Sequence, residues 1–131
     1  MPFADSFPVR AMGPRTDLSF AYVHADIGAS GAPTIDEAKT TAGFSITRSG
    51  TGTYSLTFPK CRFCLPIGDV RPDDTADETD ARKVNVAKDL DPTSGAVTFT
   101  TQEYVDVTAD TSTIADPVSG SEIVFIVLLG F

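Results

Sequence analysis

Two cysteines, Cys61 and Cys64, stand three residues apart and are the side chains in this sequence most able to do chemistry. A zinc site needs four ligands, normally two such pairs or one pair with two histidines, and this chain has two cysteines and one histidine. A redox pair of the thioredoxin type needs the motif at a helix N-terminus, but here it follows a proline in a strand-like stretch. Side chains three apart in an extended segment point to opposite faces, which opposes a disulfide. We therefore expect ordinary packed thiols, with a redox role or a metal site shared between subunits as the alternative.

The single histidine, His24, is the next candidate. It lies on the same alternating face as Tyr22 and Asp26. No serine or cysteine in a recognisable nucleophile elbow accompanies it, so a catalytic triad is not expected. We interpret His24 as a half-buried or interfacial residue.

An acidic run occupies residues 69–81. Between Asp69 and Asp80 it holds six acids against one arginine, Arg71. The possible calcium ligands are Asp73, Asp74, Asp77, Glu78 and Asp80. They lack the spacing of an EF-hand loop, so we expect a solvated surface loop, with calcium binding as the alternative.

The sequence also lacks the patterns of two other kinds of active site. The chain has no tryptophan on which a glycosidase could stack a sugar, and GASGAP lacks the helix and lysine of a phosphate-binding loop. We expect a protein that is not an enzyme and that uses no cofactor and no metal.

The length, composition and net charge of the chain limit the molecules that it can be expected to bind. A chain of 131 residues with 41% apolar residues should form one domain with a core. The net charge of −8 repels nucleic-acid phosphates and anionic lipid, so neither is an expected partner. The N-terminal stretch has no apolar signal region, and the longest apolar run, IVFIVLL, is too short to span a membrane. We expect a soluble protein made in a cytoplasm.

Eight short segments show the alternation of apolar and polar residues that is typical of strands. They are DLSFAYVHADI, GFSITR, TYSLTF, CRFCLPI, KVNVAK, GAVTFTT, EYVDVTA and SEIVFIVLLG. Gly50 and Gly52 favour a hairpin between the second and third segments, and Pro59 ends the third. The segment TIDEAK predicts one helical turn. The order predicts an all-β fold: an antiparallel β-sandwich, most simply a jelly roll, over residues 18–131, after an extended N-terminal arm at residues 1–17.

The last predicted strand has two apolar faces. One consists of Ile123, Phe125, Val127 and Leu129. The other consists of Val124, Ile126 and Leu128. A strand that is apolar on both faces should be covered on both, and one face is the sandwich core. We expect the face of Val124, Ile126 and Leu128 to be a subunit interface.

The stretches RSGTGTYSLTFPK and GSEIVFIVLLGF resemble the trimeric jelly rolls of phage virions. The shared features are a polar Gly/Thr turn, an aromatic-led strand and a terminal apolar strand that ends in Gly-Phe. The resemblance implies a homotrimer of a tailed bacteriophage, assembled in the host cytoplasm and located in the virion. Since the chain has no stalk of the kind that a fibre needs, it is most similar to a capsid decoration (cement) protein. Its other implied partner is the major capsid protein.

The predicted arm fits this interpretation. Three prolines oppose regular structure in it, yet it carries more apolar surface than a solvated tail. We expect it to dock on a neighbouring subunit or to anchor the protein on an acidic capsid surface, with a disordered or self-packed N-terminus as the alternative. The expected anchoring residues are Phe3, Phe7, Val9, Arg10 and Met12.

Two other functions compete with a decoration protein. One is a receptor- or glycan-binding head or tail-fibre domain, which needs an exposed aromatic cluster; Tyr54, Tyr104 and Phe63 are the candidates. The other is a metal-dependent enzyme on a cupin-like barrel, which normally shows several metal-binding histidines. The single histidine argues against that enzyme.

Overall fold

The computed structural model describes residues 18–72, 82–87, 90–106 and 111–131. These residues form strands and one short 3-10 turn, η1 (Ala29–Gly31). The strands are β1 (Leu18–Ile27), β2 (Pro33–Ile35), β3 (Ser45–Gly50), β4 (Thr53–Thr57), β5 (Phe63–Arg71), β6 (Arg82–Val86), β7 (Ala96–Asp106), β8 (Thr111–Ile114) and β9 (Glu122–Gly130).

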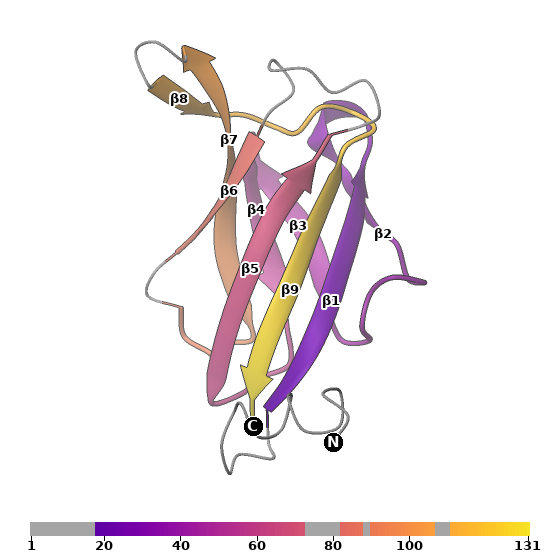
Figure 1. Cartoon of the computed structure of the whole chain (residues 1–131), viewed down its shortest axis with the longest axis vertical. Helices are drawn as coiled ribbons and strands as arrows, with labels where there is room; N and C mark the ends of the chain where they lie inside the picture. Colours follow the sequence, from indigo (N-terminus) through magenta and orange to yellow (C-terminus); the bar gives the residue numbers. More distant parts are fainter. Residues whose placement is uncertain (1–17, 73–81, 88–89, 107–110) are drawn as a thin grey trace, which may run out of the picture.

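The strands build two antiparallel sheets. Sheet A has the order β2-β1-β9-β5, and sheet B has the order β3-β4-β7-β6, with β8 paired to the second half of β7. In Figure 1 the strands β1, β9 and β5 run side by side along the front, and β3 and β4 lie behind them. The predicted all-β antiparallel sandwich is confirmed.

Three local predictions are wrong. The segment TIDEAK does not open a helix, because Thr34 and Ile35 pair with β1 in β2 and only a tight turn follows at Asp36. The strands predicted at GAVTFTT and EYVDVTA are not separate, because β7 (Ala96–Asp106) runs from the first segment into the second. The acidic run begins inside β5, where Val70 is buried, so residues 69–71 are strand and not loop.

The core lies between the two sheets. Inward positions of β1 carry only aliphatic side chains, whereas β4, β7 and β9 each send an aromatic ring inward. The Tyr54 and Phe99 rings stack at 5.5 Å, and the Phe99 and Phe125 rings meet edge to face at 4.9 Å. These three rings connect sheet B to sheet A, and such aromatic pairs add to the free energy gained by burial.

Gly68 makes room for the last of these rings. It stands opposite Phe125 in the β5–β9 ladder. A Cβ atom added at Gly68 would lie 2.4 Å from a ring carbon of Phe125. The close packing of sheet A against the aromatic core therefore requires glycine at this position.

We predict that Gly68→Ala lowers the free energy of unfolding by about 1–3 kcal/mol, because the added methyl overpacks the core. Chemical denaturation measures the change. Gly50→Ala is the matched control, since nothing lies within 4 Å of a Cβ built at Gly50. Equal stability of the two variants would contradict the proposed packing role of Gly68.

Candidate interaction surface

The outer surface of sheet A is apolar over three neighbouring strands. Because side chains alternate along a strand, those that leave the core on β1, β9 and β5 gather on this side. We call this surface the sheet A face. It consists of Phe20, Tyr22, Phe63, Leu65, Ile67, Val124, Ile126 and Leu128.

The ladder registers bring these side chains into rows. Leu128 of β9 stands between Phe20 of β1 and Leu65 of β5. In the next row Ile126 stands between Tyr22 and Ile67. Directly opposite residues have Cβ atoms about 4.5–5.5 Å apart, so the rows merge into one continuous surface.

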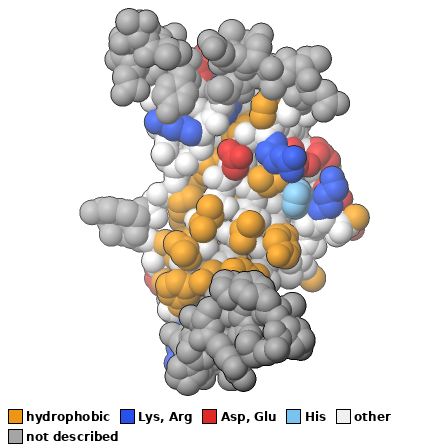
Figure 2. Space-filling view, in the orientation of Figure 1, with side chains coloured by type: hydrophobic (Ala, Val, Ile, Leu, Met, Phe, Trp, Pro, Cys, Tyr) orange, Lys and Arg blue, Asp and Glu red, His pale blue; other side chains and the backbone are white. Residues whose placement is uncertain are grey.

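The sheet A face is open in the single chain. Six residues of the sheet A face are 40–63% exposed: Phe20, Tyr22, Phe63, Leu65, Ile67 and Ile126. Figure 2 shows apolar side chains gathered over the middle of this side of the molecule. Monomeric proteins rarely expose a contiguous apolar patch larger than a few hundred Å². Such a surface is typical of a site that another molecule covers.

The sequence indicated only the central column of this surface. Val124, Ile126 and Leu128 lie on the outer side of β9, as the alternation predicted. Phe63 was named as an exposed aromatic residue, but the position of β1 and β5 beside this column was missed, since alternation within one strand does not reveal which strands are neighbours. The outward aromatic pair of β1, Phe20 and Tyr22, was the available signal.

A charged end borders the apolar rows. The last row consists of Asp26, Glu122 and Arg71. The Glu122 carboxylate lies 3.6 Å from Nδ1 of His24 and 3.7 Å from Arg71, and Nζ of Lys39 is 3.9 Å away. This end of sheet A therefore carries charges of both signs, and it sets a polar limit to the apolar surface.

His24 is partly buried at this border, as predicted. Its side chain is 22% exposed, and its Nδ1 atom is buried without a hydrogen bond. The backbone of His24 is held by the segment after β2, where Thr40 Oγ1 accepts from the His24 N–H at 3.0 Å. His24 therefore belongs to the rim of the sheet A face.

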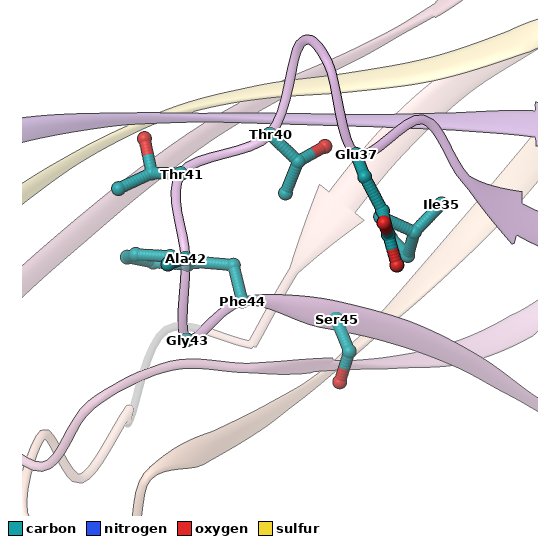
Figure 3. A pocket seen from close by; sticks show the side chains of 8 residues that line it. All are labelled: Ile35, Glu37, Thr40, Thr41, Ala42, Gly43, Phe44 and Ser45. Carbon is teal, nitrogen blue, oxygen red and sulfur yellow. The ribbon is translucent and has the colours of Figure 1, made fainter.

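The same segment lines a pocket of about 450 Å³, shown in Figure 3. The lining residues are Ile35, Glu37, Thr40, Thr41, Ala42, Gly43, Phe44 and Ser45. The hydroxyls of Thr40 and Thr41 accept hydrogen bonds from the backbone of β1. They close the open edge of that strand, so we assign these hydroxyls a structural role.

The two cysteines are free thiols, but one prediction about them is wrong. Cys61 is buried and Cys64 is partly buried. Their thiols interact and do not point to opposite faces, because Cys61 precedes β5 and the chain bends at Arg62 before the strand begins. Burial raises the pKa of Cys64 to about 12, with a further contribution from Cys61, and burial also raises the pKa of Cys61. Both groups are protonated at neutral pH.

A polar cluster around Asp116 was not foreseen from the sequence. The Asp116 carboxylate accepts two hydrogen bonds from Arg48, at 3.0 and 2.9 Å, and one from the Gly52 N–H at 2.7 Å. The Tyr54 hydroxyl lies 3.2 Å from the same carboxylate and donates to the Gly31 carbonyl oxygen at 2.8 Å. The Arg48 guanidinium holds the pKa of Asp116 below its usual range, and burial raises the pKa of Tyr54. Because the carboxylate is held on several sides by the protein itself, we interpret the cluster as a structural clamp.

Several sequence candidates lie elsewhere. Tyr54 is a fully buried core residue, so it is no part of an exposed aromatic cluster, whereas Phe63 is on the sheet A face. The side chain of Tyr104, the arm at 1–17 and the calcium candidates at 73–80 lie outside the described residues. In the described part of the chain no group of three or more His, Cys, Asp or Glu side chains could hold a metal ion. That part also contains no helix long and apolar enough to cross a membrane.

No protein-family model matches this chain. The comparisons with curated proteins and with solved structures also gave no match. The sheet A face is therefore the feature on which a functional proposal can be built.

We predict that the folded cysteines react slowly with a disulfide reagent at pH 8. With a pKa of about 12, the thiolate fraction of Cys64 is on the order of a thousandfold below that of an unperturbed thiol. Absorbance of the released thiol measures the rate, and the guanidinium-unfolded protein is the control. Equal rates in the folded and unfolded states would contradict the assigned environment.

We predict that Asp116→Asn lowers stability at pH 7 by about 1 kcal/mol, the net value of a hydrogen bond after solvent screening. The pKa of Asp116 is lowered in the folded state, so its contribution is complete above the unfolded pKa near 4 and is lost as pH falls through the folded pKa. The difference from wild type should therefore shrink below about pH 4. Unfolding curves between pH 2 and 7 measure it, with Asp26→Asn as an exposed control. A difference that stays constant with pH would contradict the clamp.

Proposed function

We propose that this protein is a non-enzymatic structural protein of a phage virion, a capsid decoration protein that assembles as a homotrimer. The observation that carries the assembly step is the sheet A face, a continuous apolar surface on a single chain. The virion setting comes from the resemblance of the hairpin and of the last strand to trimeric virion jelly rolls. The proposed subunit interface is centred on Val124, Ile126 and Leu128.

The energetics favour association through this surface. Full burial of a large apolar side chain is worth about 1.5–3 kcal/mol, so covering the exposed half of each contributes about 1 kcal/mol. Six side chains of the sheet A face are exposed to this degree on every subunit. Their sum is of the same order as the cost of association, which is about 4–15 kcal/mol. The proposed trimer must therefore bury further rim contacts to reach a dissociation constant in the micromolar range.

The arm supplies the proposed contact with the shell. Its expected anchoring residues are Phe3, Phe7, Val9, Arg10 and Met12. They combine apolar side chains with one positive charge on a protein of net charge −8. Three arms on one trimer bind a repeating shell with avidity, so each single contact can be weak.

A receptor- or glycan-binding head is the second candidate. The observation that favours it is the pair Phe20 and Tyr22, whose rings are 51% and 53% exposed on one side of β1. Exposed aromatic rings can stack on sugars. A glycan array separates this function from the first, because a decoration protein should bind no glycan there.

We predict that Ile126→Asp abolishes self-association and leaves the subunit folded. Ile126 is 48% exposed, so the aspartate is solvated in the single chain, whereas it would be an unpaired buried charge in the trimer. Sedimentation velocity reports the change in mass, and thermal unfolding checks the fold.

Ile114→Asp is the matched control for this experiment. Ile114 is 51% exposed but lies on β8, away from the sheet A face. The Ile114→Asp substitution should leave the trimer intact. A wild-type protein that stays monomeric at about 100 µM, far above a micromolar dissociation constant, would rule out the proposed interface.

The virion assignment has its own test. The protein should be found by mass spectrometry in purified particles of the phage that encodes it, in an amount that scales with the major capsid protein. Particles without the protein, from cells in which it is expressed, would contradict the assignment.

A further inference from the structure

The N-terminal arm begins where the sheet A face begins. Leu18, the first described residue, stands in the row with Gly130 and Phe63 at the apolar end of sheet A. The charged row with Glu122 is at the opposite end. The 17 residues that precede Leu18 are therefore attached beside the exposed apolar rows and far from the charged rim.

The length of this segment suits the surface. From the row of Leu18 to the row of His24 and Val124 the face is six residues long, or about 20 Å. The arm reaches it only if the chain reverses, and Gly13-Pro14 is a turn signal at the required place. From Met12 back to Phe3 the chain can span about 30 Å, which is enough to cross the apolar rows.

The pattern of this segment suits the surface as well. In an extended chain Phe7, Val9 and Ala11 lie on one side, because alternate residues share a face. Phe3 and Phe7 can each cover about 150–250 Å² of apolar surface. Together they match a patch of a few hundred Å².

We propose that in the free subunit residues 1–17 fold back over the sheet A face of their own chain. The arm and a second copy then compete for the same apolar rows. This inference rests on the proposed function, because it names what regulates the subunit interface. Assembly of the trimer displaces the arm, and the arm becomes available for the shell only once the subunits have joined.

Photo-cross-linking of the full-length chain tests the docking. A benzophenone side chain replaces Phe7, and the matched control carries it at Ser6. The protein is a mixture of light and heavy isotope-labelled chains, diluted until it is monomeric. Mass spectrometry should find cross-links within one chain to the outward residues of β1, β9 or β5, at least tenfold more abundant at position 7 than at position 6. Cross-links between chains only, cross-links to other surfaces, or none would each overturn the proposal.

Competition is tested separately by self-association. The double variant Phe7→Ser with Val9→Ser should form trimers at a concentration about thirtyfold lower than wild type, if the arm occupies the face in nine of ten free subunits and each of the three subunits must release it. Ser6→Ala is the control and should match wild type. An unchanged dissociation constant in the double variant would overturn the competition. If no variant self-associates, the proposed trimer fails, while the cross-links still decide whether the arm docks on the face.

Discussion

Strand β9 is hydrogen-bonded on both sides, to β1 and to β5, and the arrangement of sheet A depends on this double pairing. Because β9 has neighbours on both edges, its backbone is fully paired, and its side chains alternate between the two faces of the sheet. Phe125 and its inward neighbours contact the aromatic rings of sheet B and so form the core. Ile126 and its outward neighbours meet the matching rows of β1 and β5. One apolar strand therefore produces both the core and the open surface.

The far side of the sandwich is held by a different kind of interaction. Asp116 comes from the segment before β9, and its carboxylate binds groups on β3, on the β3–β4 turn and on β4. Gly31 lies so close that an added Cβ would be 2.4 Å from Asp116 Cγ. The clamp fixes the path of the chain from sheet B into β9, and through β9 it positions the outward row of Ile126.

Prediction from sequence succeeded where a feature is local. Alternation within SEIVFIVLLG was enough to assign Ile123 to one face and Val124 to the other, and Pro59 correctly closed the strand of Tyr54. It failed where partners are distant in the chain. Cap chemistry predicted a helical turn at Thr34, but pairing with Asp26 gave a strand, because ladder hydrogen bonds outweigh a single cap.

The sheet A face also combines local features, which the sequence predicts, with distant partners, which it does not. The need to cover Ile126 could be read from the sequence, but its neighbours Tyr22 and Ile67 could not, since they are about 104 and 59 positions away and only the ladder register joins them. Likewise, nothing local relates Arg48 to Asp116.

The hydrogen bonds that Thr40 and Thr41 make to β1 limit the direction in which molecules can meet. From Tyr22 to Ile27 the outer edge of β1 is occupied by this segment and by β2, so no foreign strand can add there. At the other edge of sheet A, β5 contains Pro66, which has no N–H to offer to an incoming strand. Lateral growth of the sheet, the route to fibrils, is thus opposed at both margins. The outer face of sheet A is left as the contact surface of the proposed trimer, and contact through a face favours a closed assembly over an open-ended ribbon.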